Sequence, residues 1–270
     1  MRQNKKSSLQ VEKTAAYISE WLKDYANNAK VSGFVVGVSG GIDSAVTSTL
    51  CALTGMKTIC FELPIHQPSN HVSRAREHID QLSKRFPNVS RGITDLTETF
   101  ETIKAAFPND GDEATLHLAL ANTRARLRMT TLYFHAGVNH CIVAGTGNKV
   151  EDFGVGFYTK YGDGGVDVSP IADLMKSDVY ALGQYLGVPD SILNAVPSDG
   201  LFHDDRTDED QLGASYDELE WAMEQLEAGK TPDDFEGRQK EAFTIFTRLN
   251  RANKHKMDPI PVCMIPTSLR

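Results

Sequence analysis

The residues best suited to chemistry stand together near the start of the chain. An apolar run at 34–38 leads directly into Ser39-Gly40-Gly41-Ile42-Asp43-Ser44, and the sequence then becomes helical in character. Adjacent glycines let the backbone adopt conformations that other residues resist. A helix starting near Ser44 would turn its free N–H groups and the positive end of its dipole toward this turn, which favours anion binding. The serines add hydroxyl donors, and Asp43 can hold a Mg²⁺ ion beside a phosphate.

This turn is not a Walker A loop, because it has no lysine. It resembles the Ser-Gly-Gly-x-Asp-Ser loop of the N-type ATP pyrophosphatases, which cleave ATP between its α- and β-phosphates and pass AMP to an oxygen of the substrate. The alternative, a strand-to-helix corner that merely needs two glycines, does not account for six matching positions. The resemblance implies that ATP is held by Gly37, Val38, Ser39, Gly40, Gly41, Ile42, Asp43 and Ser44.

Composition narrows the class of protein. The chain has 270 residues and a formal net charge of −8, which argues against nucleic acid as a main partner. No apolar stretch approaches the ~20 residues of a membrane span, and the polar, basic start has no apolar segment of the signal-peptide type. We therefore expect a cytoplasmic protein without a membrane partner. The cysteines are far apart and are interpreted as reduced core residues: Cys51, Cys60, Cys141 and Cys263.

The order of predicted elements indicates an α/β fold in a single domain over 1–270. Apolar strands at 34–38, 58–63, 89–93 and 141–144 alternate with helical segments at 9–30, 44–55, 70–86, 95–106, 113–136 and 176–186. This alternation predicts a doubly wound parallel sheet with helices on both faces. Ligands bind such sheets beyond the carboxyl ends of the strands, where the strand order reverses. The glycine-rich segments 39–44 and 145–147 should therefore flank the site.

Two further segments carry specific expectations. Residues 113–136 form a helix with apolar residues on most faces, and such a helix must be covered all round. A subunit interface, and hence a homodimer, would cover it; the alternative is a central helix buried within one subunit. Residues 199–211 are so highly charged that we expect a mobile loop. Beyond them, Ser215 and Glu218 have capping-box spacing at the start of a helix to about 228, and a last helix should span 232–252.

Longer motifs along the chain resemble those of the NAD synthetases. They occur in the order of that family over most of residues 30–256, and they comprise 122–129 (NTRARLRM), 145–152 (GTGNKVED), 157–167 (FYTKYGDGGVD), Pro170-Ile171 with Lys176, 206–209 (RTDE) and His255-Lys256. The pyrophosphate loop alone would indicate only the superfamily. The combination indicates the family.

The resemblance implies the last step of NAD biosynthesis. The carboxylate of deamido-NAD (nicotinic acid adenine dinucleotide) would attack the α-phosphate of ATP and release pyrophosphate, and ammonia would then displace AMP to give NAD. Such chemistry depends on positioning and on positive charge, because the carboxylate must approach a polyanion. Residues 1–36 are too few for a glutamine-hydrolysing domain, so we expect an enzyme that uses ammonia directly.

The resemblance also implies roles for individual residues. Asp43 and Glu151 would hold Mg²⁺, with Asp43, Lys176 and Asp163 serving catalysis. Further ATP contacts would come from Thr146, Lys176 and Ser198, the last standing where the family often has threonine. Contacts with deamido-NAD would come from Arg126, Lys160, Asp167, His255 and Lys256. Asp163 either binds or deprotonates the incoming ammonium, or is a turn aspartate that caps backbone N–H groups.

Three other functions fit the sequence less well. Another adenylating amidotransferase, of the GMP synthetase type, would share the pyrophosphate loop but should lack the segment from Lys160 to Asp167. A tRNA-thiolating enzyme is disfavoured by the acidic charge and by the missing CxxC pair. A catalytically inactive ATP-binding regulator would have no need of an intact set of Asp43, Glu151 and Lys176.

Overall fold

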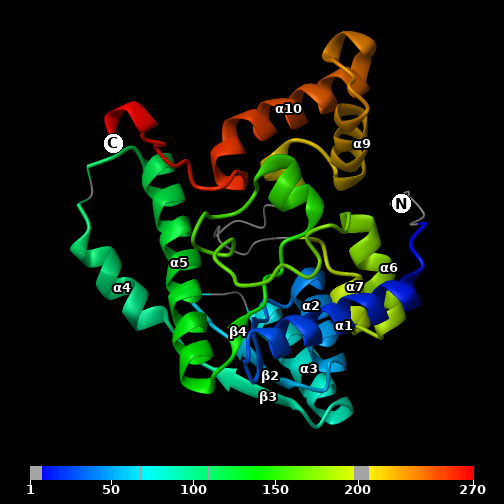
Figure 1. Cartoon of the computed structure of the whole chain (residues 1–270), viewed down its shortest axis with the longest axis vertical. Helices are drawn as coiled ribbons and strands as arrows, with labels where there is room; N and C mark the ends of the chain where they lie inside the picture. Colours follow the sequence, from blue (N-terminus) through cyan, green and yellow to red (C-terminus); the bar gives the residue numbers. More distant parts are fainter. Residues whose placement is uncertain (1–7, 67–68, 109, 198–206) are drawn as a thin grey trace.

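A parallel sheet lies at the centre of the computed structural model, which describes residues 8–66, 69–108, 110–197 and 207–270 (Figure 1). Within these residues the sheet has four strands in the order β3-β2-β1-β4. They are β1 (Gly33–Gly37), β2 (Lys57–Glu62), β3 (Val89–Ile93) and β4 (Ile142–Val143). All three pairings are parallel. The strand order reverses between β1 and β4, where the sequence placed the site.

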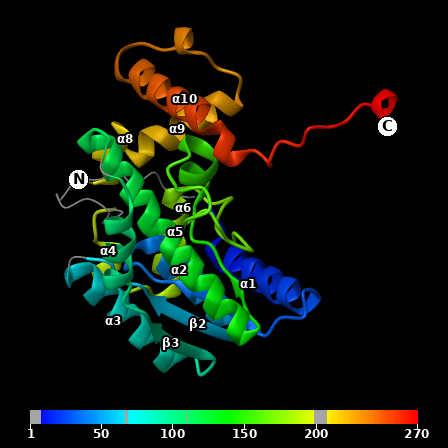
Figure 2. The same cartoon turned by 90° about the vertical axis from the view of Figure 1, so that its left-hand side faces the viewer.

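Helices cover both faces of the sheet, which confirms the predicted doubly wound fold (Figures 1 and 2). One face carries α1 (Val11–Asn28), α2 (Ile42–Leu53), α3 (Ser69–Arg85) and α6 (Lys176–Leu186). The other carries α4 (Thr97–Ala106) and the long α5 (Glu113–Asn139). The rest comprises η1 (Val150–Val155), α7 (Asp190–Leu193), α8 (Asp208–Leu212), α9 (Tyr216–Glu227), η2 (Pro232–Asp234), α10 (Gly237–Met257) and η3 (Thr267–Leu269).

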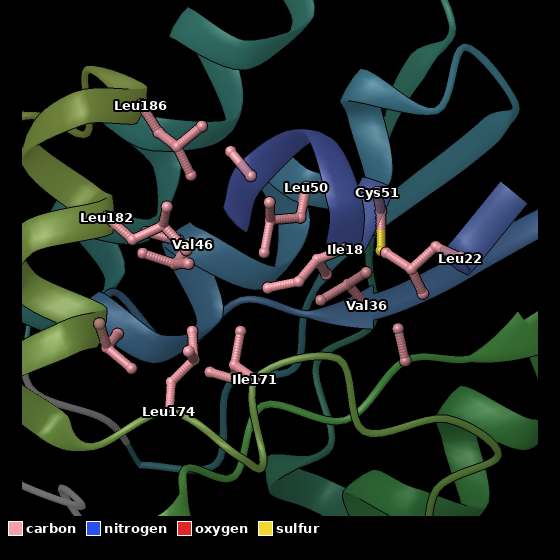
Figure 3. Close-up of a cluster of buried hydrophobic side chains, with 14 of the residues drawn as sticks. Ile18, Leu22, Val36, Val46, Leu50, Cys51, Ile171, Leu174, Leu182 and Leu186 are labelled. Atoms are coloured by element: carbon pink, nitrogen blue, oxygen red, sulfur yellow. The ribbon is translucent and has the colours of Figure 1, made fainter. Parts of the chain in front are cut away.

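The largest apolar cluster fixes the helix that follows β1. Alternate residues of a strand point to opposite faces, so Val36 packs with α1, α2 and α6 while Val35 packs toward α5. Figure 3 shows side chains of α1, α2 and α6 in one cluster, in which Leu22 lies near Val36 and Leu182 lies near Val46. Each fully buried side chain of this size contributes about 1.5–3 kcal/mol. This packing holds the start of α2 beside the end of β1.

A second apolar cluster holds the polypeptide beyond β4. The π-helical turn η1 contributes Val150 and Val155, which pack against α9 and α10 with Leu219, Phe243 and Phe246. Single π-helical turns are often found at functional sites. The cluster thus joins the last helices of the chain to the segment that follows the sheet.

The long helix α5 differs from one of the two expectations for it. Within α5, buried positions are confined to Ala121, Arg124, Ala125 and Ala136. Leu118, Phe134 and Val138 are 58–65% exposed. The alternative of a central helix buried within one subunit is therefore wrong, since one face of α5 is open to solvent. Whether a second copy covers it stays a prediction.

Two smaller expectations also need correction. Residues 208–211, expected in a mobile loop, belong to α8, whose first turn is closed by a capping box between Thr207 and Asp210; residues 198–206 lie outside the described part of the chain. Cys263 is exposed, unlike the other three cysteines. By contrast, the capping box of Ser215 and Glu218 is confirmed.

In the parts of the chain that the structure describes, no helix combines the length and the hydropathy that crossing a bilayer requires.

Buried His78 predicts how stability depends on pH. Its Nε2 lies 2.9 Å from Ser48 Oγ, and burial, with a smaller effect of the Arg85 charge, lowers its pKa to about 4. The unfolded chain therefore binds this proton at higher pH than the folded chain, so stability falls as pH drops below about 6.5. This one group should remove about 2 kcal/mol between about pH 7 and pH 5.

We expect His78→Gln to abolish that part of the pH dependence, measured by urea unfolding at the two pH values. His140→Asn is the matched control, because His140 is exposed and left-handed at the end of α5, a conformation that asparagine tolerates. It should keep the full wild-type slope. An unchanged slope in His78→Gln would contradict this account.

Candidate functional site

The glycine-rich turn connects the end of β1 directly to the first turn of α2. Gly40 has a φ of 84°, a left-handed conformation that favours glycine. Ser44 Oγ accepts from Ser39 N at 3.2 Å and donates to Gly41 O at 3.0 Å. Ser39 Oγ in turn accepts from Gly41 N. These bonds close the turn on itself and leave the N-terminal end of α2 facing the carboxyl edge of the sheet, an arrangement suited to an anion.

One ammonium group joins two carboxylates at this edge. Lys176 Nζ donates to Asp43 Oδ2 at 2.7 Å and to Glu151 Oε1 at 2.9 Å. The Lys176 side chain is only 5% exposed. Burial acts to lower its pKa, but attraction to Asp43 and then Glu151 outweighs burial, so the pKa lies above its usual value. The bridge brings together α2, η1 and α6, from three separate parts of the chain.

The two carboxylates of this bridge are not equivalent. Burial raises the pKa of Asp43, which attraction to Lys176 only partly offsets. Burial also acts to raise the pKa of Glu151. Attraction to Lys176 and the hydrogen bond from Tyr216 outweigh burial, so the pKa of Glu151 is lowered. Glu151 is therefore the more firmly ionised of the two.

Sequence reasoning missed two residues that orient these carboxylates. Buried Asn148 donates from Nδ2 to Asp43 Oδ1 at 2.9 Å, and its Oδ1 accepts from Glu151 N at 3.1 Å. Tyr216 donates its phenolic O–H to Glu151 Oε1 at 2.6 Å. Asn148 lay within one of the recognised motifs, which was a usable signal. Tyr216 had none, because its position became meaningful only when α9 packed against η1.

The position of Lys176 is fixed from behind by α9. Glu220, buried to 1% exposure, accepts from Ser177 N and Ser177 Oγ, both at 2.8 Å. A carboxylate at a helix N-terminus satisfies backbone donors and favours the dipole. Lys176 begins α6 and is adjacent to this cap, so Glu220 holds the helix end from which the ammonium group reaches the bridge.

A continuous cavity of about 750 Å³ extends from the glycine-rich turn to the last helix. The predicted residues that line it are Gly37, Val38, Ser39, Gly40, Gly41, Ile42, Asp43, Ser44, Thr146, Glu151, Lys176, Arg126, Lys160, Asp163, His255 and Lys256. Asp167 is not among the lining residues; its carboxylate accepts from Tyr133 O–H and from Val143 N. Ser198 lies outside the described residues, so its predicted role stays a prediction.

The far end of the cavity is built from basic side chains held by backbone oxygens. Lys160 Nζ donates to His255 O at 2.6 Å. Lys256 Nζ donates to Gly156 O at 2.8 Å and to Tyr158 O at 2.9 Å. Arg126 Nε donates to Lys160 O at 3.3 Å. These bonds tie α5, the segment after η1 and the end of α10 into one cationic wall.

The other two arginines of the α5 motif make different contacts, and Arg128, unlike Arg124, also lines the cavity. Arg124 is buried with its guanidinium 5.2 Å from the centre of the Phe100 ring. Arg128 Nε donates to Leu63 O at 3.0 Å. A further arginine that sequence reasoning missed is Arg74 of α3, which lines the cavity and donates from Nε to Gly40 O at 3.2 Å. It brings a positive charge to the glycine-rich turn.

Asp163 is a turn aspartate that also lines the cavity, and its role toward ammonium stays a prediction. Its Oδ1 accepts from Thr159 N at 2.9 Å, as a turn aspartate does, and it also lines the cavity. Burial raises its pKa, which hydrogen bonds from backbone N–H groups partly offset. Nearby Asp152 has its pKa raised to about 8 by burial and by the Glu151 charge. The raised pKa values favour the neutral carboxyl form of both residues, which limits the negative charge between the lysine bridge and the cationic wall.

These features define a class of protein. A parallel sheet with a glycine-rich turn and a helix N-terminus at its switch point is characteristic of α/β nucleotide-binding proteins. Here the same edge also holds a lysine-bridged carboxylate pair and opens into a cavity with a cationic far wall.

Comparison with known proteins defines the family. A model of the NAD synthase family matches residues 14–260, and the chain belongs to this family. An NH(3)-dependent NAD(+) synthetase of Methanosarcina mazei is 36% identical over 94% of this chain and 98% of its own length. One from Carboxydothermus hydrogenoformans is 34% identical over 91% and 94%. Among solved structures, an NMN synthetase from Francisella tularensis has a TM-score of 0.82 at 31% identity, covering 96% of this chain and 100% of that one.

The Tyr216–Glu151 hydrogen bond predicts a cost in stability. Tyr216→Phe keeps the ring, whose centre lies 4.7 Å from Lys176 Nζ, but removes a donor from a buried carboxylate. We expect the free energy of unfolding in urea to fall by about 1.5–3 kcal/mol. Tyr185→Phe, at a half-exposed position of α6, is the control and should change it by less than about 0.5 kcal/mol. Equal losses in the two variants would contradict a specific role for this bond.

Proposed function

We propose that the protein is a ligase that amidates deamido-NAD with ammonia, consuming ATP and releasing AMP and pyrophosphate. The observation that carries this proposal is the continuous cavity, which joins the glycine-rich turn to the cationic wall of Arg126, Lys160 and Lys256. Such a cavity suits two anionic substrates that must meet. The curated relatives, named NH(3)-dependent NAD(+) synthetases and matched over nearly their whole length, support the same reaction.

The proposed chemistry explains why the two ends of the cavity differ. A carboxylate resists attack by ammonia until its oxygen becomes a good leaving group, so the substrate is first adenylated at the α-phosphate of ATP. That step brings two anions together, and electrostatic stabilisation must supply much of the catalysis. The phosphates of ATP would be faced by the α2 N-terminus, Arg74 and Lys176. The phosphates of deamido-NAD would be held by the cationic wall.

Asp43 and Glu151 fit a Mg²⁺ ion. Their hard carboxylate oxygens converge on one cation, the Lys176 ammonium, and an ion of higher charge suits the same oxygens. When bound, Mg²⁺ would neutralise phosphate charge. Lys176 would then be released from the carboxylates to contact ATP, which reconciles its bridging position with its predicted ATP-binding role. We propose the same single domain over 1–270, and nitrogen supplied as free ammonia.

A second substrate has one observation in its favour. The solved structure with a TM-score of 0.82 is an NMN synthetase, and it is matched over its full length. An enzyme of that name forms the mononucleotide. The corresponding substrate, nicotinic acid mononucleotide, has the same carboxylate and lacks the second nucleotide, so it would use the phosphate turn identically and less of the cationic wall.

The decisive experiment is a two-stage assay. The protein is mixed with ATP and Mg²⁺, then with deamido-NAD or nicotinic acid mononucleotide, and ammonium is added last. We expect pyrophosphate release to require the acid substrate, and amide to form when ammonium is added. The larger kcat/KM identifies the preferred acid. We expect that to be the dinucleotide, and glutamine to give no product.

Different failures have different meanings. Pyrophosphate release with neither acid would overturn the proposed reaction and leave only a nucleotide-binding protein. Efficient amide formation from glutamine by the pure chain would overturn the proposal that free ammonia is the nitrogen donor. A higher kcat/KM for the mononucleotide would replace the proposed substrate with the second one.

A substitution of Asp163 would distinguish the adenylation half-reaction from amide formation. We propose that its carboxylate binds ammonium or accepts a proton from it, which is consistent with its burial at the cavity wall. Asp163→Asn should leave pyrophosphate release nearly intact and slow amide formation by about tenfold or more. Asp173→Asn, at an exposed position, is the matched control and should affect neither. Loss of pyrophosphate release in Asp163→Asn would remove this role.

We also propose a homodimer formed through α5. From Ala119 to the end of this helix, the exposed residues make a surface with a single charged member, which we call the α5 stripe: Ala119, Arg126, Thr130, Tyr133, Phe134, Gly137 and Val138. Small and apolar residues in this arrangement favour close approach of a second helix. Because Arg126 also lines the cavity, the dimer contact would border the substrate.

A further inference from the structure

The C-terminal arm, residues 259–270, is an apolar segment in which every residue is exposed. Its large side chains Ile260, Val262, Met264 and Leu269 are 67–77% exposed. Figure 2 shows the arm leaving the end of α10 and extending away from the body of the molecule. Among the described residues, its backbone hydrogen bonds join only its own members, Leu269 N with Pro266 O and Arg270 N with Thr267 O. Such exposed apolar surface indicates a binding partner.

Hydrogen bonds to other segments anchor the start of the arm, whereas the rest of the arm has no such anchor among the described residues. Lys256, two residues before α10 gives way to Asp258, is hydrogen-bonded to Gly156 O and Tyr158 O, and His255 O accepts from Lys160 Nζ. The arm therefore leaves every copy of the protein at the same place and in the same direction. In a twofold-symmetric dimer each copy would present its arm identically to the other.

Composition indicates how the arm binds. Residues 259–269 (PIPVCMIPTSL) contain no charged side chain. Pro259, Pro261 and Pro266 remove backbone donors and restrict φ, so the arm cannot extend a sheet as a regular strand and must bind through its side chains. The same prolines lower the entropy lost when an extended segment is ordered.

The α5 stripe is the surface that matches these properties. Both the arm and the half of the stripe from Thr130 to Val138 are uncharged and rich in apolar residues. At about 3.3 Å per residue the arm could extend for about 40 Å. A helix of 27 residues, the length of α5, is likewise about 40 Å long. The arm of one copy is thus long enough to follow the helix of another.

We infer that two copies of the chain exchange their C-terminal arms, each arm packing on the α5 stripe of the other copy. This inference rests on the proposed homodimer and adds to it a specific occupant for part of the exposed helix. The matched family region ends at residue 260, so nearly all of the arm lies beyond it. The exchange would close the surface beside Arg126 and so connect assembly with the substrate end of the cavity.

Cys263 makes the exchange directly testable. It lies within the arm and is exposed, whereas Cys51, Cys60 and Cys141 are buried. A benzophenone maleimide attached to Cys263 and photoactivated at low protein concentration should give a covalent product of twice the chain mass on a denaturing gel. Mass spectrometry of that product should place the crosslinks in residues 113–139. The matched control carries Cys263→Ser and Lys230→Cys, which moves the label to the exposed end of α9, and should give no crosslink to α5.

Other outcomes overturn the exchange. Crosslinks confined to products of single-chain mass would mean that the arm folds back on its own chain. Crosslinks between chains but outside α5 would reject this occupant. Sedimentation separates the two levels of the argument, because a monomeric protein would defeat the homodimer as well, whereas a dimer without arm-to-α5 crosslinks would defeat only the exchange.

A second variant tests the energetics without disturbing the fold. Val262→Asp with Met264→Asp places charge on the arm at side chains that are more than 70% exposed. We expect the dimer dissociation constant to rise by about tenfold or more, while urea unfolding of the dissociated chain stays unchanged. The matched control Thr267→Asp with Ser268→Asp adds the same charge at the arm's small polar residues and should have a smaller effect. Equal dissociation constants for wild type and the Val262/Met264 variant would contradict the exchange.

Discussion

The structure depends on one buried ammonium group shared by two carboxylates. Lys176, Asp43 and Glu151 come from α6, α2 and η1, and each would carry an uncompensated charge in a poorly solvated place if the others moved. Removing one partner of a buried ion pair is far more costly than the net gain from forming it. The bridge therefore acts as a geometric requirement on the fold, because the three elements must meet with their charged groups within hydrogen-bonding distance.

Apolar packing meets that requirement from two sides. The cluster around Val36 and Leu50 holds α2 against α6 and the sheet, and the cluster around Phe243 and Phe246 holds η1 against α9 and α10. The bridge lies where the two clusters adjoin. Polar residues then refine it, with Asn148 linking Asp43 to the backbone of η1, and Glu220 fixing the start of α6. The positions of the charged groups in the bridge are therefore set by apolar packing and by hydrogen bonds from residues outside the bridge.

The sequence could predict features that depend on local patterns, but not those that depend on contacts between distant residues. The glycine-rich turn, the strands and the bounds of α6 follow from local patterns, and all were found within a few residues. The Tyr216–Glu151 bond joins residues 65 apart in sequence, so no local pattern reveals it. The high charge of residues 208–211 predicted a loop, but these residues are helical. A capping box orders α8, and Asp208 is buried beside the Tyr216 hydroxyl.

A single chain satisfies its buried charges at the bridge but leaves part of its apolar surface exposed. Its buried charges are paired within the chain at the bridge, where desolvation leaves little tolerance. Apolar surface is more forgiving, since its cost grows gradually with exposed area, and here it remains open on α5 and along the arm. Both surfaces adjoin the cationic wall, through Arg126 on one side and Lys256 on the other. Assembly would therefore act on the substrate end of the cavity while leaving the bridge, already satisfied, unchanged.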